Sequence, residues 1–453
     1  MTSKLKRLVL PLYLALCIVV GGSSQAILPS AILQVAAIAL IVWAIAARAS
    51  EQATAPSRRL LLLLGLFALL AIVQLLPLPP SLWSALPGRA IIAQGFEALG
   101  YALPWQPLSM TPYATVASAM ALLPPAAVLL MGVRHRQREA WLAATLVLCT
   151  LVGVLLGAVQ LATGGPASSA AYFYEVTNDG AVGFFANRNH MGSLLLVGIP
   201  FGVALFASAS SLAQRDNKLA GVTVFAVAAL LVVLAGIALN RSLAALSLAL
   251  PVILFSGLLL PPSMRLRRFA LPAGALALVA TMMVLVSSSI GDELTGSDTS
   301  SFTSRAEIWD RTSALIGKTL PLGTGLGSFV SVYPLAEDPA EATRTFVNHA
   351  HNDLLELTLE LGAAGVILLL LFLAWWGRQV VRVWRTTLST VYARAATIAS
   401  GALLAHSLVD YPLRTPALAA VFAMCLALMT QPWLSRRSSE RAAVRPTKHV
   451  TIG

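Results

Sequence analysis

Runs of about twenty consecutive apolar residues recur along the whole chain, and each is long enough to cross a bilayer as a helix. Only helices and closed barrels satisfy their backbone hydrogen bonds in lipid, and these runs are continuous rather than alternating, which indicates helices. The sequence therefore predicts an all-α, polytopic membrane protein of about 12 transmembrane helices. The predicted spans lie near residues 8–26, 31–47, 60–76, 115–132, 140–162, 191–208, 219–239, 243–260, 269–288, 354–376, 395–411 and 416–434.

Composition excludes an ordinary soluble enzyme, because charged residues make up only 11% of the chain. A net charge of +12 would suggest a nucleic-acid partner in a soluble protein. Here basic residues instead mark the cytoplasmic loops when the N-terminus is placed inside, which predicts the inner membrane of a bacterium. The N-terminal basic residues before the first span read as a retained signal anchor. Eight cations among the 31 Lys and Arg break the inside pattern: Arg89, Arg188, Arg241, Arg305, Arg311, Lys318, Arg344 and Arg414.

The domain organisation follows from the same topology. Residues 1–434 form one predicted transmembrane domain, and the basic segment 435–453 is a predicted disordered cytoplasmic tail. A second outer segment, 77–114, carries Trp83, Trp105 and Tyr113, aromatic residues suited to the headgroup level. The three cysteines, Cys17, Cys149 and Cys425, lie inside apolar runs and read as core residues.

One outer loop, 289–353, is long and polar, and we expect it to face the periplasm. Apolar residues recur at helical spacing over 301–318, with Ser301 as the N-cap, which predicts a surface helix within the loop. The glycine-rich stretch 321–327 is predicted to end this helix and to allow close approach of a ligand.

Four of the outer cations are candidate ligands for a lipid-linked diphosphate, because guanidinium binds phosphate oxygens through paired hydrogen bonds. Arg188 precedes a span and is followed by Asn189. Arg241 lies at a short outer turn, and Arg305 and Arg414 flank the late spans. An ordinary surface ion pair is the alternative for each of them.

The second cluster of candidate residues lies where the long loop enters a span. It consists of His349, His351, Asn352, Asp353 and Glu356, and His349, Asp353, Glu356 and Glu360 follow helical spacing, so they are expected on one face. Acids at a membrane entrance are costly unless they face a cavity or a partner, and a histidine beside carboxylates serves as a general base near neutral pH. Two histidines at i and i+2 do not share a helix face, so no metal site and no cofactor are predicted.

Several motifs, in this order, resemble the superfamily of O-antigen ligases and O-antigen polymerases. The resemblance covers about residues 180–415 and rests on residues 183–190, Asn240-Arg241-Ser242, 304–309, 321–327, His349-Ala350-His351-Asn352 with Gly362 and Gly365, and 406–412.

The resemblance implies transfer of a glycan from undecaprenyl diphosphate to an acceptor hydroxyl at the periplasmic face, without metal or nucleotide. The acceptor would be lipid A core in a ligase, or another lipid-linked repeat in a polymerase; the sequence leaves both open. Carried onto this chain, the essential residues are Arg241, Arg305 and His351, with His349 as neighbour. Many relatives have proline where this chain has Arg188, which weakens the assignment of that position.

Two other classes stay open on the sequence. A transporter of a small anion would need charged residues near the middle of spans and a paired repeat, and neither pattern is evident. A non-catalytic factor in polysaccharide assembly would tolerate loss of Arg305 and His351.

Overall fold

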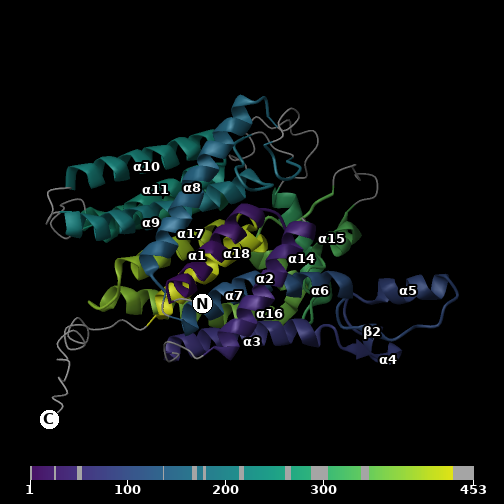
Figure 1. Ribbon diagram of the computed structural model, residues 1–453. Helices are drawn as coiled ribbons and strands as arrows, with labels where there is room; N and C mark the ends of the chain where they lie inside the picture. The colour runs from purple at the N-terminus through teal and green to yellow at the C-terminus, as the bar shows by residue number, and fades with distance from the viewer. Residues whose placement is uncertain are drawn as a thin grey trace, which may run out of the picture.

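The computed structural model is an α-helical bundle (Figure 1). It describes residues 3–24, 27–47, 54–135, 137–165, 171–176, 180–213, 219–260, 267–286, 305–337 and 346–431. The predicted tail 435–453, the N-cap Ser301, and Arg344 lie outside these residues. The first half of the bundle comprises α1 (Ser3–Val20), α2 (Ile27–Ala46), α3 (Ala55–Val73), α6 (Pro112–Ala121), α7 (Leu123–Arg134), α8 (Glu139–Ala162) and α9 (Arg188–Ala213).

The second half comprises α10 (Leu219–Asn240), α11 (Leu243–Ser256) with the 3₁₀ turn η1 (Gly257–Leu259), α12 (Arg267–Val286), α14 (Arg305–Thr319), α15 (Phe329–Val332), η2 (Tyr333–Ala336), α16 (Asp353–Arg385), α17 (Val391–His406), η4 (Pro412–Arg414) and α18 (Pro416–Thr430). The described residues overlap all twelve predicted spans with helix. Seven helical segments are long and apolar enough to cross a bilayer, namely α2, α3, α6 with α7, α8, α9, α10 and α16. Four further apolar helices are shorter, so the all-helical membrane class is confirmed while the count of twelve stays a prediction.

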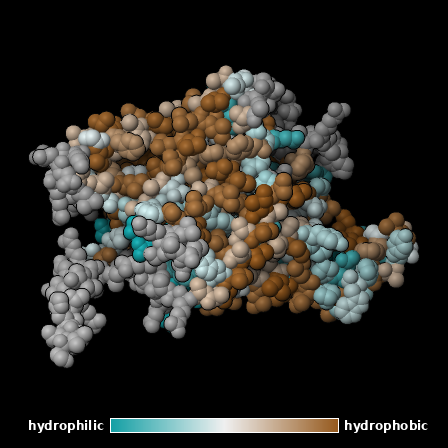
Figure 2. All heavy atoms as spheres, viewed as in Figure 1, coloured by the Kyte–Doolittle hydropathy of each residue, from teal (hydrophilic) through white to brown (hydrophobic). Residues whose placement is uncertain are grey.

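Two helices form the centre of the bundle. Helix α18 packs against α1, α7 and α17, and helix α9 packs against α8, α10, α11 and α17. The three cysteines are buried in this apolar interior, as predicted. Apolar side chains also cover much of the outer surface of the helices (Figure 2), as expected for helices that face lipid.

Contacts between helix ends agree with spans that alternate in direction. At one end of the bundle Arg134 donates to Ala44 O at 2.7 Å, and Thr54 donates to Thr430 O at 3.0 Å. Trp375 Nε1 donates to Pro56 O at 3.1 Å at the same end. The predicted topology places all these positions on the inner side. The predicted outer positions meet at the opposite end, as described below.

The outer segment 77–114 forms a small arm that projects from the bundle (Figure 1). Strands β1 (Pro77–Leu78) and β2 (Gln106–Pro107) pair antiparallel, with helices α4 (Pro80–Trp83) and α5 (Ala90–Ala98) between them. Trp83 is buried within the arm, and its Nε1 donates to Pro104 O at 2.8 Å. Trp105 and Tyr113 are exposed. Arg89 is buried, its guanidinium donates to Gly323 O, and burial lowers its pKa to about 10.

Candidate functional site

The ends of helices that are distant in sequence meet at one end of the bundle. Asn240, the last residue of α10, donates to Arg188 O at 2.8 Å at the start of α9. Ser242, the N-cap of α11, donates to the side-chain oxygen of Asn189 at 2.7 Å. Asn189 in turn donates to the carboxylate of Asp410, in the turn between α17 and α18. A continuous chain of polar contacts therefore joins α9, α10, α11 and that turn.

Tyr411 occupies the centre of this region, between three histidine rings. Its ring centroid lies 4.0 Å from that of His349, 4.8 Å from that of His190 and 5.1 Å from that of His351. Asn348 donates to the hydroxyl of Tyr411 at 3.1 Å, which also ties down the segment before α16. The ring of Tyr411 therefore packs against all three histidine rings.

Asp410, the residue before Tyr411, lies beside two histidines. Its Oδ1 lies 3.5 Å from His351 Nδ1 and 4.0 Å from His190 Nε2, and the carboxylate is fully buried. The charge of Arg305, the first residue of α14, acts on Asp410. This geometry pairs the predicted base His351 with a carboxylate and places the predicted phosphate ligand Arg305 nearby.

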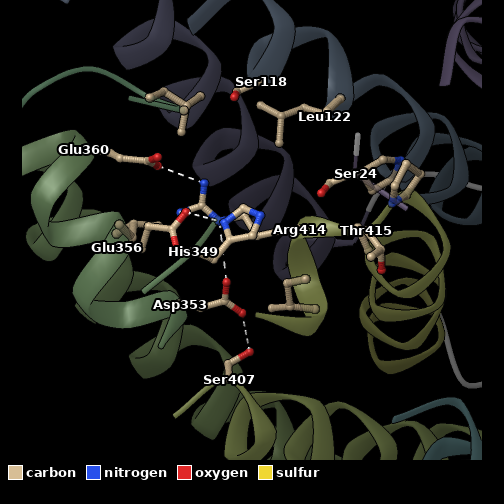
Figure 3. A pocket seen from close by; sticks show the side chains of 18 of the residues that line it. Ser24, Ser118, Leu122, His349, Asp353, Glu356, Glu360, Ser407, Arg414 and Thr415 are labelled. Atoms are coloured by element: carbon tan, nitrogen blue, oxygen red, sulfur yellow. Dashed lines mark hydrogen bonds and ion pairs between the residues drawn. The ribbon is translucent and has the colours of Figure 1, made fainter. Parts of the chain in front are cut away.

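Three carboxylates surround Arg414, three residues after Tyr411. The guanidinium lies 2.9 Å from Glu360 Oε2, 3.5 Å from Glu356 Oε1 and 3.6 Å from Asp353 Oδ1 (Figure 3). Burial alone would lower the pKa of Arg414, but the three carboxylates raise it instead, so this cation stays charged. His349 Nδ1 lies 2.8 Å from Glu356 Oε1. The charge of Arg414 is therefore compensated by acidic residues of the protein, which is not what we expect of a guanidinium that binds phosphate.

Two of the predicted residues have strained backbones. Arg241 has φ 56° and His351 has φ 49°, and they are the non-glycine residues with positive φ in the described part of the chain. Such conformations cost free energy and persist where the surroundings enforce them, commonly at functional sites. Trp309, one turn after Arg305 on α14, helps to enforce the second, because its Nε1 donates to Ala350 O at 3.0 Å.

Helix α16 is broken at Gly362, which has φ 59° and ψ −150°. The glycine-rich stretch 321–327 fills the break: Gly325 N donates to Glu360 O and Ala363 N donates to Pro321 O. Gln74 bridges the same elements, donating to Glu360 O and accepting from Leu326 N at 2.9 Å each. Helix α14 ends just before the glycine-rich stretch, as predicted. The stretch was also predicted to approach a ligand closely, and in the structure it approaches the backbone of α16.

A cavity of about 920 Å³ extends from this region between α16, α17 and α18 on one side and α2, α3, α6 and α7 on the other. His349, Asp353, Glu356, Glu360 and Arg414 lie at its polar end (Figure 3). The remaining lining is mostly apolar and includes Leu369, Leu373 and Trp376 of α16.

The structure brings most of the predicted site residues together, with two differences. Asn352 is the N-cap of α16 and accepts from Leu354 N and Leu355 N, so its side chain is engaged in the fold. His349 precedes that cap, so the prediction that it shares a helix face with Asp353 and Glu356 is wrong, although it still contacts Glu356. Arg241 is exposed beside Asn240.

Sequence reasoning did not assign four buried residues to the site: His190, His406, Asp410 and Tyr411. His406 Nδ1 lies 2.7 Å from the hydroxyl of Ser193 on α9. The available signal was the motif at 406–412, whose polar residues interrupt an apolar stretch.

One region of the chain matches a known protein family. The family model described as O-antigen ligase matches residues 226–370. The match runs from α10 to the middle of α16 and includes Arg241, Arg305 and His351. It confirms the resemblance on which the sequence was interpreted. The comparison with curated proteins found no match.

Proposed function

Because residues 226–370 belong to the O-antigen ligase family, we propose that this protein transfers a glycan from undecaprenyl diphosphate to the hydroxyl of an acceptor glycan. The reaction would take place at the periplasmic face of the inner membrane, and the acceptor would be lipid A core or a second lipid-linked repeat. The observation that carries the proposal is the pairing of His351 with the buried Asp410 at one end of an apolar bundle, beside helix α14, which begins with Arg305 and contacts Ala350 through Trp309.

The proposed reaction is a single displacement at the anomeric carbon. The acceptor oxygen forms the new bond to that carbon while the bond from the carbon to the diphosphate oxygen breaks. The bonding electrons leave with the diphosphate, and the acceptor proton passes to His351. With His351 Nδ1 turned toward Asp410, Nε2 is the nitrogen left to take that proton.

Arginine is proposed to stabilise the leaving group. Arg305 and Arg241 would donate paired hydrogen bonds to the diphosphate oxygens, whose negative charge increases in the transition state. Arg188 would assist at the start of α9, beside Asn189. Arg414 is already surrounded by carboxylates, so we assign it to the architecture of the site rather than to the diphosphate.

The test is in vitro transfer from a defined undecaprenyl-diphosphate glycan by the purified protein. Arg305→Ala and Arg241→Ala are expected to abolish transfer, and Arg305→Lys to impair it strongly, because an ammonium retains the charge without the paired geometry. Arg311→Ala is the matched control on the same helix, since Arg311 pairs with Glu307, and it should remain active.

Full activity of both Ala variants would remove the diphosphate role of these arginines. Wild-type turnover is expected to persist in a chelator, because arginine neutralises the leaving group. Chelator-sensitive activity restored by a divalent cation would contradict that mechanism.

A further inference from the structure

The cavity beside α16 has the form of a site for an amphiphile. Glu356 and Glu360 lie at its polar end, whereas Leu369, Leu373 and Trp376 line it farther along the same helix. Beyond the break at Gly362, the 14 residues from Gly362 to Trp376 correspond to about 21 Å of helix at 1.5 Å per residue, roughly two thirds of the thickness of a bilayer core. A molecule with a polar head and a long apolar tail matches this distribution of side chains.

The polar end of the cavity contains more carboxyl groups than cations. Asp353, Glu356 and Glu360 face one guanidinium, that of Arg414, among the described lining residues. The other outer cations, Arg188, Arg241 and Arg305, do not belong to that lining. A diphosphate head placed here would add like charge beside carboxylates, which is unfavourable.

The same end offers an unused hydrogen-bond acceptor. Glu360 is fully buried, and its Oε1 has no hydrogen-bond partner within the described structure. Buried carboxylate oxygens normally accept hydrogen bonds, so this atom calls for a donor from outside the protein. A carboxylate accepts from a sugar hydroxyl, whereas a fully ionised diphosphate has no proton to donate.

We infer that this cavity binds the acceptor, as an amphiphile whose hydroxyl-rich sugar, rather than a phosphate group, lies beside the carboxyl groups and whose apolar tail follows α16. The identification of the ligand as the acceptor rests on the proposed transfer reaction. The chemistry of the ligand rests on the cavity alone. His349 lines this cavity, whereas His351, which would take the acceptor proton, faces Asp410 and is not part of the lining. The ring of Tyr411 packs against both histidines, so the acceptor and the donor would meet beside Tyr411.

The experiment measures binding to the full-length protein in lipid nanodiscs with two radiolabelled probes, farnesyl glucoside and farnesyl diphosphate. The probes share one tail and differ only in the head. Ala405→Phe and Ala419→Phe fill the cavity, and both alanines are only half-buried, which leaves the larger ring room to fold into the cavity. Ala228→Phe on the exposed face of α10 is the matched control.

We expect each cavity variant to weaken binding of farnesyl glucoside at least tenfold and to leave binding of farnesyl diphosphate unchanged. The control should bind both probes like the wild type. Loss of farnesyl diphosphate in the cavity variants would assign the cavity to the donor and overturn the inference, as would wild-type protein that does not bind farnesyl glucoside.

A transfer assay separates this inference from the proposed function. In an active enzyme, the cavity variants should raise the KM for the acceptor and leave the KM for the donor unchanged. A protein that shows the expected binding pattern but transfers no glycan would refute the proposed reaction while keeping the assignment of the cavity.

Discussion

At the scale of single residues, the two half-buried histidines before α16 have different partners. His351 faces the buried Asp410 at 3.5 Å, and His349 lies 2.8 Å from Glu356, which is also held by Arg414 and Ala350 N. We predict that His351→Ala lowers transfer about a hundredfold or more, the scale of losing a general base. His349→Ala should cost less, because it would position the acceptor. Initial rates with saturating donor and acceptor measure both effects. Wild-type turnover in His351→Ala would transfer the role of base to His349 and Glu356.

Arg414 is predicted to act on stability. Its removal leaves Asp353, Glu356 and Glu360 clustered without a counter-charge, and breaking a buried ion pair from one side typically costs about 3–5 kcal/mol. Arg414→Leu should therefore lower the thermal stability of the purified protein markedly. Arg305→Leu, the comparison variant, should lose transfer with little change in unfolding temperature. An Arg414→Leu protein of normal stability that has lost affinity for diphosphate would restore the sequence-based role of Arg414 as a phosphate ligand.

At the scale of elements, the break in α16 sets the position of residues 353–361, the part of the helix that carries Asp353, Glu356 and Glu360. Gly362 adopts φ 59° and ψ −150°, a conformation restricted to glycine, and a Cβ there would lie 2.2 Å from Pro321 O. We predict that Gly362→Ala destabilises the protein by at least about 1–3 kcal/mol, the usual cost of such strain. Transfer should fall as well, because residues 353–361 shift with respect to Tyr411.

Gly377 provides the control within the same helix. It has no atom within 4 Å of an added Cβ, and alanine is favoured over glycine inside a helix by roughly 0.5–1 kcal/mol. Gly377→Ala should therefore keep full activity and equal or greater thermal stability. Equal behaviour of the two variants would show that the break at Gly362 does not position the site.

How much could be predicted from the sequence differs between these scales. Hydrophobic runs are a local property, so each predicted span overlaps a helix. The sequence also proposes His351 and Arg305 as site residues through their motifs, and their roles stay a prediction. The break at Gly362 was not predictable, because helical periodicity continues from the acidic residues before it into the apolar run after it, and the break depends on packing against residues 321–327. The ion pairs of Arg414 depend on how α16 and the turn before α18 are oriented in space, and residue spacing in the sequence does not give that orientation. Tyr411 reads as an ordinary aromatic residue until three histidines are seen around it.

At the scale of the whole molecule, sidedness is the prediction on which the reaction depends. The contacts at the two ends of the bundle agree with alternating spans, and the distribution of Lys and Arg predicts which end faces the cytoplasm. Ala102 in the arm lies at the predicted outer end, and Thr387 between α16 and α17 at the predicted inner end; both are exposed. The three native cysteines are buried and can be replaced to give a Cys-free background.

In intact spheroplasts, cysteine at Ala102 should react with a membrane-impermeant thiol reagent, because a polyprenyl diphosphate glycan is proposed to be used on that side. Cysteine at Thr387 should react only after lysis. The two positions control for each other, since each must become reactive when the membrane is opened. Labelling of Thr387→Cys from outside, with Ala102→Cys protected, would show that the protein has the opposite orientation in the membrane. The cluster of His351, Asp410 and Arg305 would then face the cytoplasm, and a periplasmic transfer reaction would be excluded.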